Sequence, residues 1–164
     1  MKEPRLFVGL LLVLALSACS DVFFQQPYRV VLEPAQVGYE ADDQGKVTVV
    51  KNSAFVQVSP GAPGGHLERY TYVVVDDSGN EVLLGSGSVK VEIPAGREEV
   101  GGQTNYISKK SDPFTFGLDG VAAEEHLRRG APVNWRMRIT WYARTSNGTE
   151  VGWVQEHQIK YPLR

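Results

Sequence analysis

Apolar and polar residues alternate along most of the chain from Tyr28 onward, in short runs separated by Gly, Pro, Asp and Asn. A period of two places successive side chains on opposite faces of a strand, and the intervening residues are those that turns require. The pattern therefore predicts strands near 28–33, 46–51, 54–59, 69–76, 81–86, 88–94, 113–118, 134–144 and 150–161, with a further short strand allowed near 36–40.

The last predicted hairpin has a register that follows from its residues. A three-residue loop, Ser146-Asn147-Gly148, with its glycine in the left-handed position of a bulge, sets Trp141 against Trp153 on one face. On the other face it sets basic residues against acidic ones, Arg138 against Glu156 and Arg144 against Glu150. A slip of one residue would lose all of these pairs together. We therefore expect the three-residue loop.

A second hairpin is predicted around Asp77-Ser78-Gly79 by the same reasoning. If this loop closes like the last one, Val74 lies opposite Val82 and Tyr72 lies opposite Leu84.

One helix is expected, over residues 120–129. Asp119 can accept hydrogen bonds from the free amides at its start, and Gly130 followed by Pro132 ends it. At about two and a half turns it needs packing to be stable, so we interpret it as a crossover between strands.

Many short strands and one helix predict an all-β fold, an antiparallel sandwich of two sheets formed by residues 28–164. The pattern resembles immunoglobulin-like and fibronectin type III-like domains, and residues 89–96 (VKVEIPAG) resemble a strand that enters an end turn of such a domain. The inter-sheet disulfide of some of these domains is excluded, because Cys19 is the only cysteine. A small closed barrel needs the same alternation and remains the alternative.

The first residues predict a targeting segment. Lys2 and Arg5 precede thirteen apolar or small residues at 6–18, which is too short to span a bilayer and suits a signal peptide. The four residues that end at Cys19, Leu-Ser-Ala-Cys, resemble the lipobox of bacterial lipoproteins. The alternatives are an ordinary secreted protein cut after the A-x-A-like region at Ala15-Leu16, or a buried or free thiol at Cys19.

The lipobox resemblance implies cleavage before Cys19 and acylation of its sulfur. It thus implies a signal peptide at 1–18, a lipidated cysteine with a tether at 19–27, and an exported domain anchored to membrane lipid. In a Gram-negative host this membrane would be the outer one. Two or more acyl chains hold a protein on a bilayer stably.

Composition narrows the function classes. The 164 residues suit one domain, and a charged fraction of 22% with a formal net charge of -2 gives no basic excess for binding nucleic acid. Two loops have unusual composition. Residues 59–65 are rich in Pro and Gly, and residues 96–112 are long enough to form a binding loop or a disordered one.

No constellation of catalytic or metal-binding residues is evident in the sequence. The histidines, His66, His126 and His157, are not spaced as metal ligands, and no nucleophile elbow or phosphate-binding loop is present. We therefore expect no catalytic residue, no metal and no cofactor. His157 is expected to face inward opposite Met137 as a hydrogen-bonded edge histidine.

The favoured hypothesis is a non-enzymatic envelope lipoprotein that contacts another envelope protein or a glycan, through loops or by strand addition at a sheet edge. An alternative is a carbohydrate-binding module, in which Trp135, Trp141 and Trp153 stack on sugars. It requires exposed indoles. Another alternative is an enzyme whose site is built from the two loops and includes His66.

Overall fold

The computed structural model describes residues 26–163. The predicted signal peptide, Cys19 and most of the tether therefore lie outside the described residues. The elements within that range are β1 (Tyr28–Glu33), β2 (Val37–Ala41), β3 (Val47–Val49), β4 (Lys51–Val58), β5 (Gly65–Val75), β6 (Glu81–Ile93), β7 (Arg97–Val100), β8 (Gln103–Tyr106), β9 (Lys109–Lys110), β10 (Phe114–Gly117), α2 (Gly120–Arg128), β11 (Arg136–Thr145) and β12 (Glu150–Lys160).

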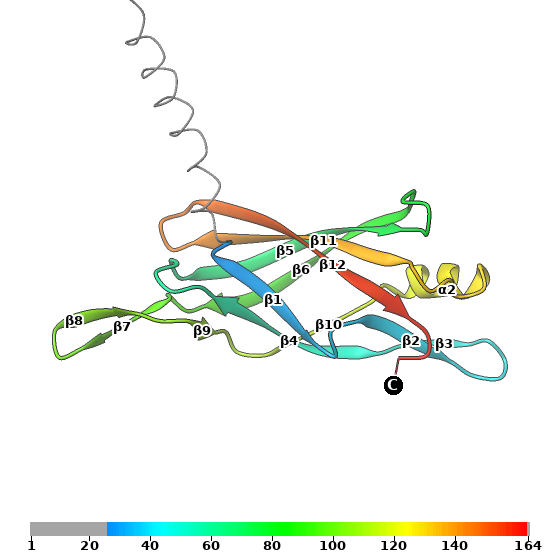
Figure 1. Cartoon of the computed structure of the whole chain (residues 1–164), viewed down its shortest axis with the longest axis horizontal. Coiled ribbons are helices and arrows are strands. Elements are labelled where there is room, and N and C mark those ends of the chain that lie inside the picture. Colours follow the sequence, from blue (N-terminus) through cyan, green and yellow to red (C-terminus); the bar gives the residue numbers. More distant parts are fainter. Residues whose placement is uncertain (1–25, 164) are drawn as a thin grey trace, which may run out of the picture.

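The predicted all-β class is confirmed, and the strands form two larger sheets and one small hairpin (Figure 1). The first sheet has the order β1-β4-β10, with β9 also paired to β4. The second has the order β3-β2-β12-β11-β5-β6. Strands β7 and β8 pair only with each other in the described chain and project from one end of the molecule.

One expectation about strand direction was wrong. Strands β2 and β12 pair in parallel, with Ile159 opposite Val37, so the second sheet is mixed rather than antiparallel throughout. The reason is the path of the chain, which leaves β1 in the first sheet and enters the second without a hairpin. The side chain of buried Asn52 holds this crossing by donating to the carbonyls of Pro34 and Gln36 at 2.7 and 2.8 Å.

The two larger sheets share one hydrophobic core. At its centre the ring of Trp141 on β11 packs against Phe116 on β10 and Tyr70 on β5, with centroid distances of 5.0 and 5.3 Å. Toward β1, Trp153 packs against Tyr28 at 5.6 Å. Aromatic pairs at these separations add stabilisation beyond the area that they bury.

The register predicted for the last hairpin is confirmed. Trp141 lies opposite Trp153, Arg138 opposite Glu156 and Arg144 opposite Glu150. Gly148 closes the loop at a φ of 85°, in the left-handed region that glycine tolerates. Its amide donates to the carbonyl of Thr145 at 2.8 Å.

In the hairpin between β5 and β6, the turn was predicted correctly, but the strand register that follows it differs from the prediction by one residue. The turn forms as expected, since the amide of Gly79 donates to the carbonyl of Asp76. A bulge follows, and Val74 then pairs with Leu83 instead of Val82. The bulge lets Val82 and Leu83 both pack against the core and turns Leu84 outward, where it is 72% exposed.

Strand β6 is one element where the sequence predicted two, and it runs through the point at which a break between 86 and 88 was expected. The segment 96–112 is also more ordered than predicted. It contains the β7-β8 hairpin, which turns on Gly101 and Gly102, both at positive φ. A Gly-Gly pair suits the two-residue hairpin turn, so the signal was present in the sequence.

The predicted helix is confirmed as α2, and it links β10 in the first sheet to β11 in the second. The side chain of Asp119 caps its start, and Gly130 follows its end at a φ of 85°. Within residues 26–163, no helix is both long enough and apolar enough to cross a membrane.

Candidate functional site

The three tryptophans singled out from the sequence belong to the core. Trp135, Trp141 and Trp153 are only 2%, 0% and 4% exposed. Stacking on a sugar needs an accessible ring face, so these residues do not form the platform that the carbohydrate-binding hypothesis requires. They contribute to the site only as packing behind it.

The histidines lie apart, and each has its own surroundings. His66 lies on β5 and not in the preceding loop. It is exposed, and on that strand it pairs across the sheet with Glu92 and Arg144. His126 is buried on α2, where Nδ1 bonds the Tyr39 hydroxyl at 2.9 Å. Among residues 26–163, no group of three His, Cys, Asp or Glu side chains could hold a metal ion.

His157 faces inward opposite Met137, and its Nδ1 lies 2.9 Å from the carbonyl oxygen of Ala35. Nδ1 is therefore the protonated nitrogen that donates to Ala35, and Nε2 is buried with no hydrogen-bond partner in the described chain. Burial lowers the pKa of His157 below its ordinary value.

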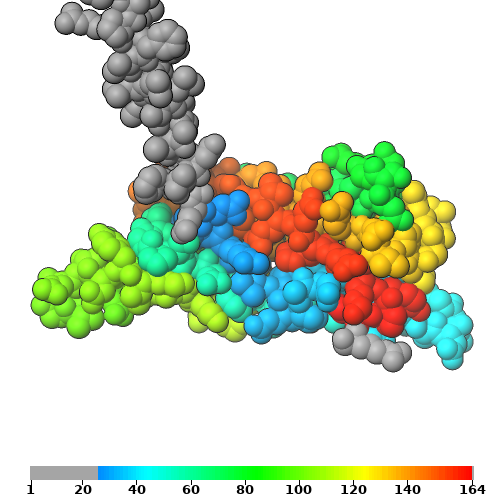
Figure 2. All heavy atoms as spheres, viewed as in Figure 1, coloured from blue at the N-terminus to red at the C-terminus, as the bar shows by residue number. Residues whose placement is uncertain are grey.

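The edge of β1 is closed by one side chain of the facing sheet. Gln155 on β12 accepts a hydrogen bond from the amide of Val30 at 2.8 Å and donates to the carbonyl of Val30 at 2.9 Å. The indole of Trp153 donates to the same Gln155 oxygen at 2.9 Å. Figure 2 shows β1, in blue, against β12, in orange and red. We call this junction the closed seam.

The junction between β6 and β10 differs. Both are edge strands of their sheets, and within residues 26–163 no hydrogen bond joins them. A cavity of about 280 Å³ lies here, which we call the slot. Its floor consists of residues that are buried or largely so, and its rim of exposed ones. The floor contains Tyr70, Tyr72, Phe116, Leu118 and Met137, and the rim contains Lys51, Ser86, Ser88, Thr115 and Gly120.

Two glycines on β6 shape the floor of the slot. A Cβ atom at Gly85 would lie 2.4 Å from the Tyr72 hydroxyl oxygen, and one at Gly87 would lie 2.4 Å from that of Tyr70. Each tyrosine therefore crosses from β5 and lies over a glycine of β6, which any larger residue would prevent. Sequence analysis missed this close approach, and the alternation Gly85-Ser86-Gly87-Ser88 is the signal that could have revealed it.

The hydroxyls in the slot stay protonated at neutral pH. Burial raises the pKa of Tyr72 to about 12, and the Asp119 carboxylate adds to this effect. Burial and the same carboxylate raise the pKa of Tyr70. One carboxylate oxygen of Asp119 accepts hydrogen bonds from the amides of Val121 and Ala122, at 2.9 and 3.3 Å.

Lys51 carries the positive charge of the rim. Its stem runs past Gly117, where an added Cβ would lie 3.4 Å from its Cδ. In the described part of the chain, no carboxylate lies within ion-pair distance of Lys51. The slot thus combines the ammonium group of Lys51, the carboxylate of Asp119 and the hydroxyls of Tyr70 and Tyr72 with apolar side chains in its floor.

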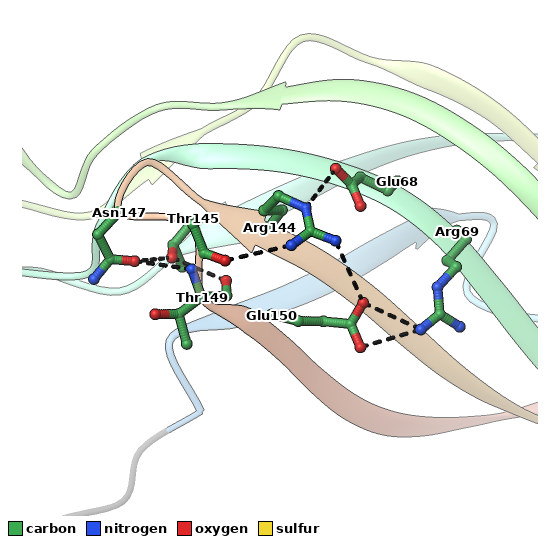
Figure 3. A network of polar contacts seen from close by, with 8 residues as sticks. Glu68, Arg69, Arg144, Thr145, Asn147, Thr149 and Glu150 are labelled. Carbon is green, nitrogen blue, oxygen red and sulfur yellow. Dashed lines mark hydrogen bonds and ion pairs between the residues drawn. The ribbon is translucent and has the colours of Figure 1, made fainter.

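A different arrangement covers the outer face of the second sheet near the last hairpin (Figure 3). Arg144 pairs with Glu68 at 3.2 Å and lies 3.9 Å from Glu150, which also pairs with Arg69 at 3.1 Å. These charges satisfy one another, so they offer less to a partner than the unpaired Lys51 does. Exposed pairs of this kind contribute at most about 1 kcal/mol each to stability.

No family model and no curated protein matches the chain. Several solved structures are similar to it, among them two at 12% identity. The X-ray structure of Northeast Structural Genomics Consortium target SoR45 matches with a TM-score of 0.41 over 83% of this chain and 88% of that one. The sporulation control protein Spo0M from Bacillus subtilis matches with a TM-score of 0.36 over 81% of this chain and 48% of its own. Likenesses at this level say nothing about function.

Proposed function

We propose that this protein is an exported, lipid-anchored binding module of the cell envelope, which takes up an extended segment of another envelope protein along the free edge of β6. The module is non-enzymatic, and its domain is an immunoglobulin-like sandwich. The observation that carries the proposal is β6 itself, a long strand that ends the second sheet and pairs on one side only in the described chain.

Strand β6 lacks the usual protection of a sheet edge. Proteins blunt such edges with charged residues, prolines or very short strands. The middle of β6, residues 85–88, contains only glycine and serine, and its charges lie toward its two ends. The edge strand β3 at the opposite side of the same sheet is three residues long, and β1 is closed by Gln155. Strand addition supplies main-chain hydrogen bonds at such an edge.

The resemblance of residues 16–19 to a lipobox supports the anchoring part of the proposal. Gln26 and Pro27 lie at one end of the domain, where Ser59 donates from its hydroxyl to Gln26 and from its amide to Pro27. The stretch between Cys19 and Tyr28 reaches at most about 30 Å when fully extended. An acylated Cys19 would therefore keep the domain close to the bilayer, within reach of other envelope proteins.

The strand-addition proposal is tested by photo-crosslinking in intact cells. A photo-reactive phenylalanine analogue replaces exposed Leu84 on β6. We expect capture of one protein, and loss of that product when S86K and S88K add charge to the edge. The matched control is T71K, since Thr71 pairs with Ser86 but lies on the interior strand β5. A product unaffected by S86K and S88K contradicts the proposal, and so does a crosslinked dimer of this chain alone.

The anchor is tested separately with C19S. The wild-type chain should incorporate a fatty-acid label and fractionate with membranes, and the C19S chain should do neither. Equal labelling and fractionation of the two chains would refute lipidation at Cys19. That result would leave the binding of a strand to β6 open to its own test.

A further inference from the structure

The slot lies where side chains of an added strand would point. Successive side chains of a strand alternate between the two faces of its sheet. A strand bound along β6 extends the second sheet, so every second side chain faces the first sheet, toward β10. The slot lies between β6 and β10, with Ser86 and Ser88 on one rim and Thr115 on the other.

The size of the slot suits one side chain. At about 280 Å³ it is at or below the lower limit for pockets that bind drug-sized molecules, which measure about 300–1,000 Å³. The hydroxyls of Tyr70 and Tyr72 in its floor can donate hydrogen bonds, whereas the side chains of Ser86 and Ser88 alternate with Gly85 and Gly87 and so lie on the opposite face of β6. Such a site selects for an acceptor group on the bound segment.

The charged groups that line the slot indicate which kind of acceptor group on the bound segment it would favour. Lys51 has no carboxylate partner in the described residues, whereas Asp119 is held by two amides at the start of α2 and lies beside Tyr72. The slot is therefore lined by one carboxylate, that of Asp119, and one ammonium group, that of Lys51, and of the two only Lys51 has no hydrogen-bonded or ion-paired partner in the described residues. We propose that the slot binds the carboxylate of an Asp or Glu side chain on the strand that β6 takes up, with Lys51 as its ion-pair partner. This inference rests on the proposed function and deepens it.

The test uses purified full-length chain and three labelled nonapeptides that alternate Thr and Val and differ only in a central Glu, Gln or Lys. We expect the Glu peptide to bind at least about tenfold more tightly than the Gln peptide, because a hydrogen bond to a charged group contributes about 1.5–3 kcal/mol. The Lys peptide should bind most weakly. K51Q should abolish the preference for Glu, and K51R should retain most of it.

Two further measurements isolate the role of Lys51. The side chain is exposed, so K51Q should leave the thermal unfolding midpoint unchanged, and any loss of binding then comes from the slot. Added salt should reduce the preference for the Glu peptide and leave Gln binding nearly constant. A Glu preference that survives K51Q contradicts the inference.

The outcomes separate this inference from the proposed function. Equal binding of the Glu and Gln peptides, lost in the S86K and S88K variant, overturns the slot inference and supports strand addition. No binding by any peptide, together with no crosslink at residue 84, overturns both. Sodium glutarate is the control for a free acid. If it competes with the Glu peptide at equal concentration, the slot takes a free carboxylate, and the peptide assignment is wrong.

Discussion

The two seams between the sheets differ in how they treat the unpaired backbone groups of an edge strand. At the closed seam, one amide side chain, that of Gln155, meets both the donor and the acceptor of Val30 on the edge of β1. At the seam between β6 and β10, no described side chain plays that part, and hydroxyls, a glycine-rich strand and unpaired Lys51 surround a cavity. On the proposed function, the first seam serves stability and the second takes up the bound strand.

Removing the Gln155 amide should give the largest effect. Q155A leaves the amide and carbonyl of buried Val30 and the Trp153 indole without their partner. We expect a loss of about 3 kcal/mol in the free energy of unfolding, because each buried group left unpaired costs about 1–3 kcal/mol and water will reach part of the site. Urea titration measures this loss.

Gln158 provides the matched control for this experiment. It is also a glutamine on β12, but it is exposed and makes one hydrogen bond, to the carbonyl of Val133. Q158A should lower stability by no more than about 0.5 kcal/mol. Equal effects of Q155A and Q158A would show that Gln155 does not close the seam.

Much of the fold was predictable where the decisive contacts are local. The register of β11 with β12 followed from facing Trp141 with Trp153 and from opposite charges on the other face. The predicted register of β5 with β6 was wrong because Val82, Leu83 and Leu84 are three apolar residues in a row. The sequence does not show which of them a bulge leaves without a partner on β5. The parallel contact of β2 with β12 joins distant segments, and a single sequence does not show it.

The two seams were less predictable than the strands that form them. Gln155 falls on the apolar face of its strand in the predicted register, so its need for a polar partner was readable, but Val30 was not identifiable as that partner. The Gly-Ser alternation at 85–88, which we interpreted as a break between two strands, was the available signal for a close approach at β6. The slot itself requires β10 beside β6, and that placement depends on how two sheets pack.

A methyl group added to the floor of the slot should have a smaller effect than the loss of Gln155. G87A places a Cβ 2.4 Å from the Tyr70 hydroxyl, and the Tyr70 ring is packed against Phe116 and Trp141. The ring must shift, at a cost of about 1–2 kcal/mol in the free energy of unfolding. The same shift should weaken binding of the Glu peptide, because Tyr70 lines the slot.

Gly152 on β12 is the control for G87A. It is exposed, and a Cβ there would lie 3.4 Å from the Tyr142 ring, at ordinary contact distance. G152A should be neutral or stabilise the fold by about 0.5–1 kcal/mol, since alanine loses less backbone entropy than glycine on folding. If G87A is as well tolerated as G152A, the tyrosines do not depend on the glycines of β6.

The smallest expected effect is a dependence of the closed seam on pH. His157 on β12 bonds Ala35 in the connection that follows β1, and its Nε2 is buried without a partner. Burial lowers the pKa of His157 in the folded protein by more than the hydrogen bond to Ala35 raises it, and nearby Arg29 lowers it further. The unfolded chain, with an ordinary pKa of about 6.5, therefore binds the proton more readily. Neutral His157 therefore contributes to the stability of the folded protein above pH 6.5, and this contribution is lost as the pH falls through the folded-state pKa of His157.

H157N isolates this contribution, because the asparagine amide can still donate a hydrogen bond to the carbonyl of Ala35 and does not titrate. Urea unfolding between pH 7 and pH 5 should show a smaller loss of stability in H157N than in the wild type. Buried His126, whose pKa burial also lowers, keeps its share of the dependence in both chains. An NMR titration that places the pKa of His157 at or above 6.5 would contradict this account. It would mean that water reaches the ring, and that the closed seam is open at the end where β1 leaves the first sheet.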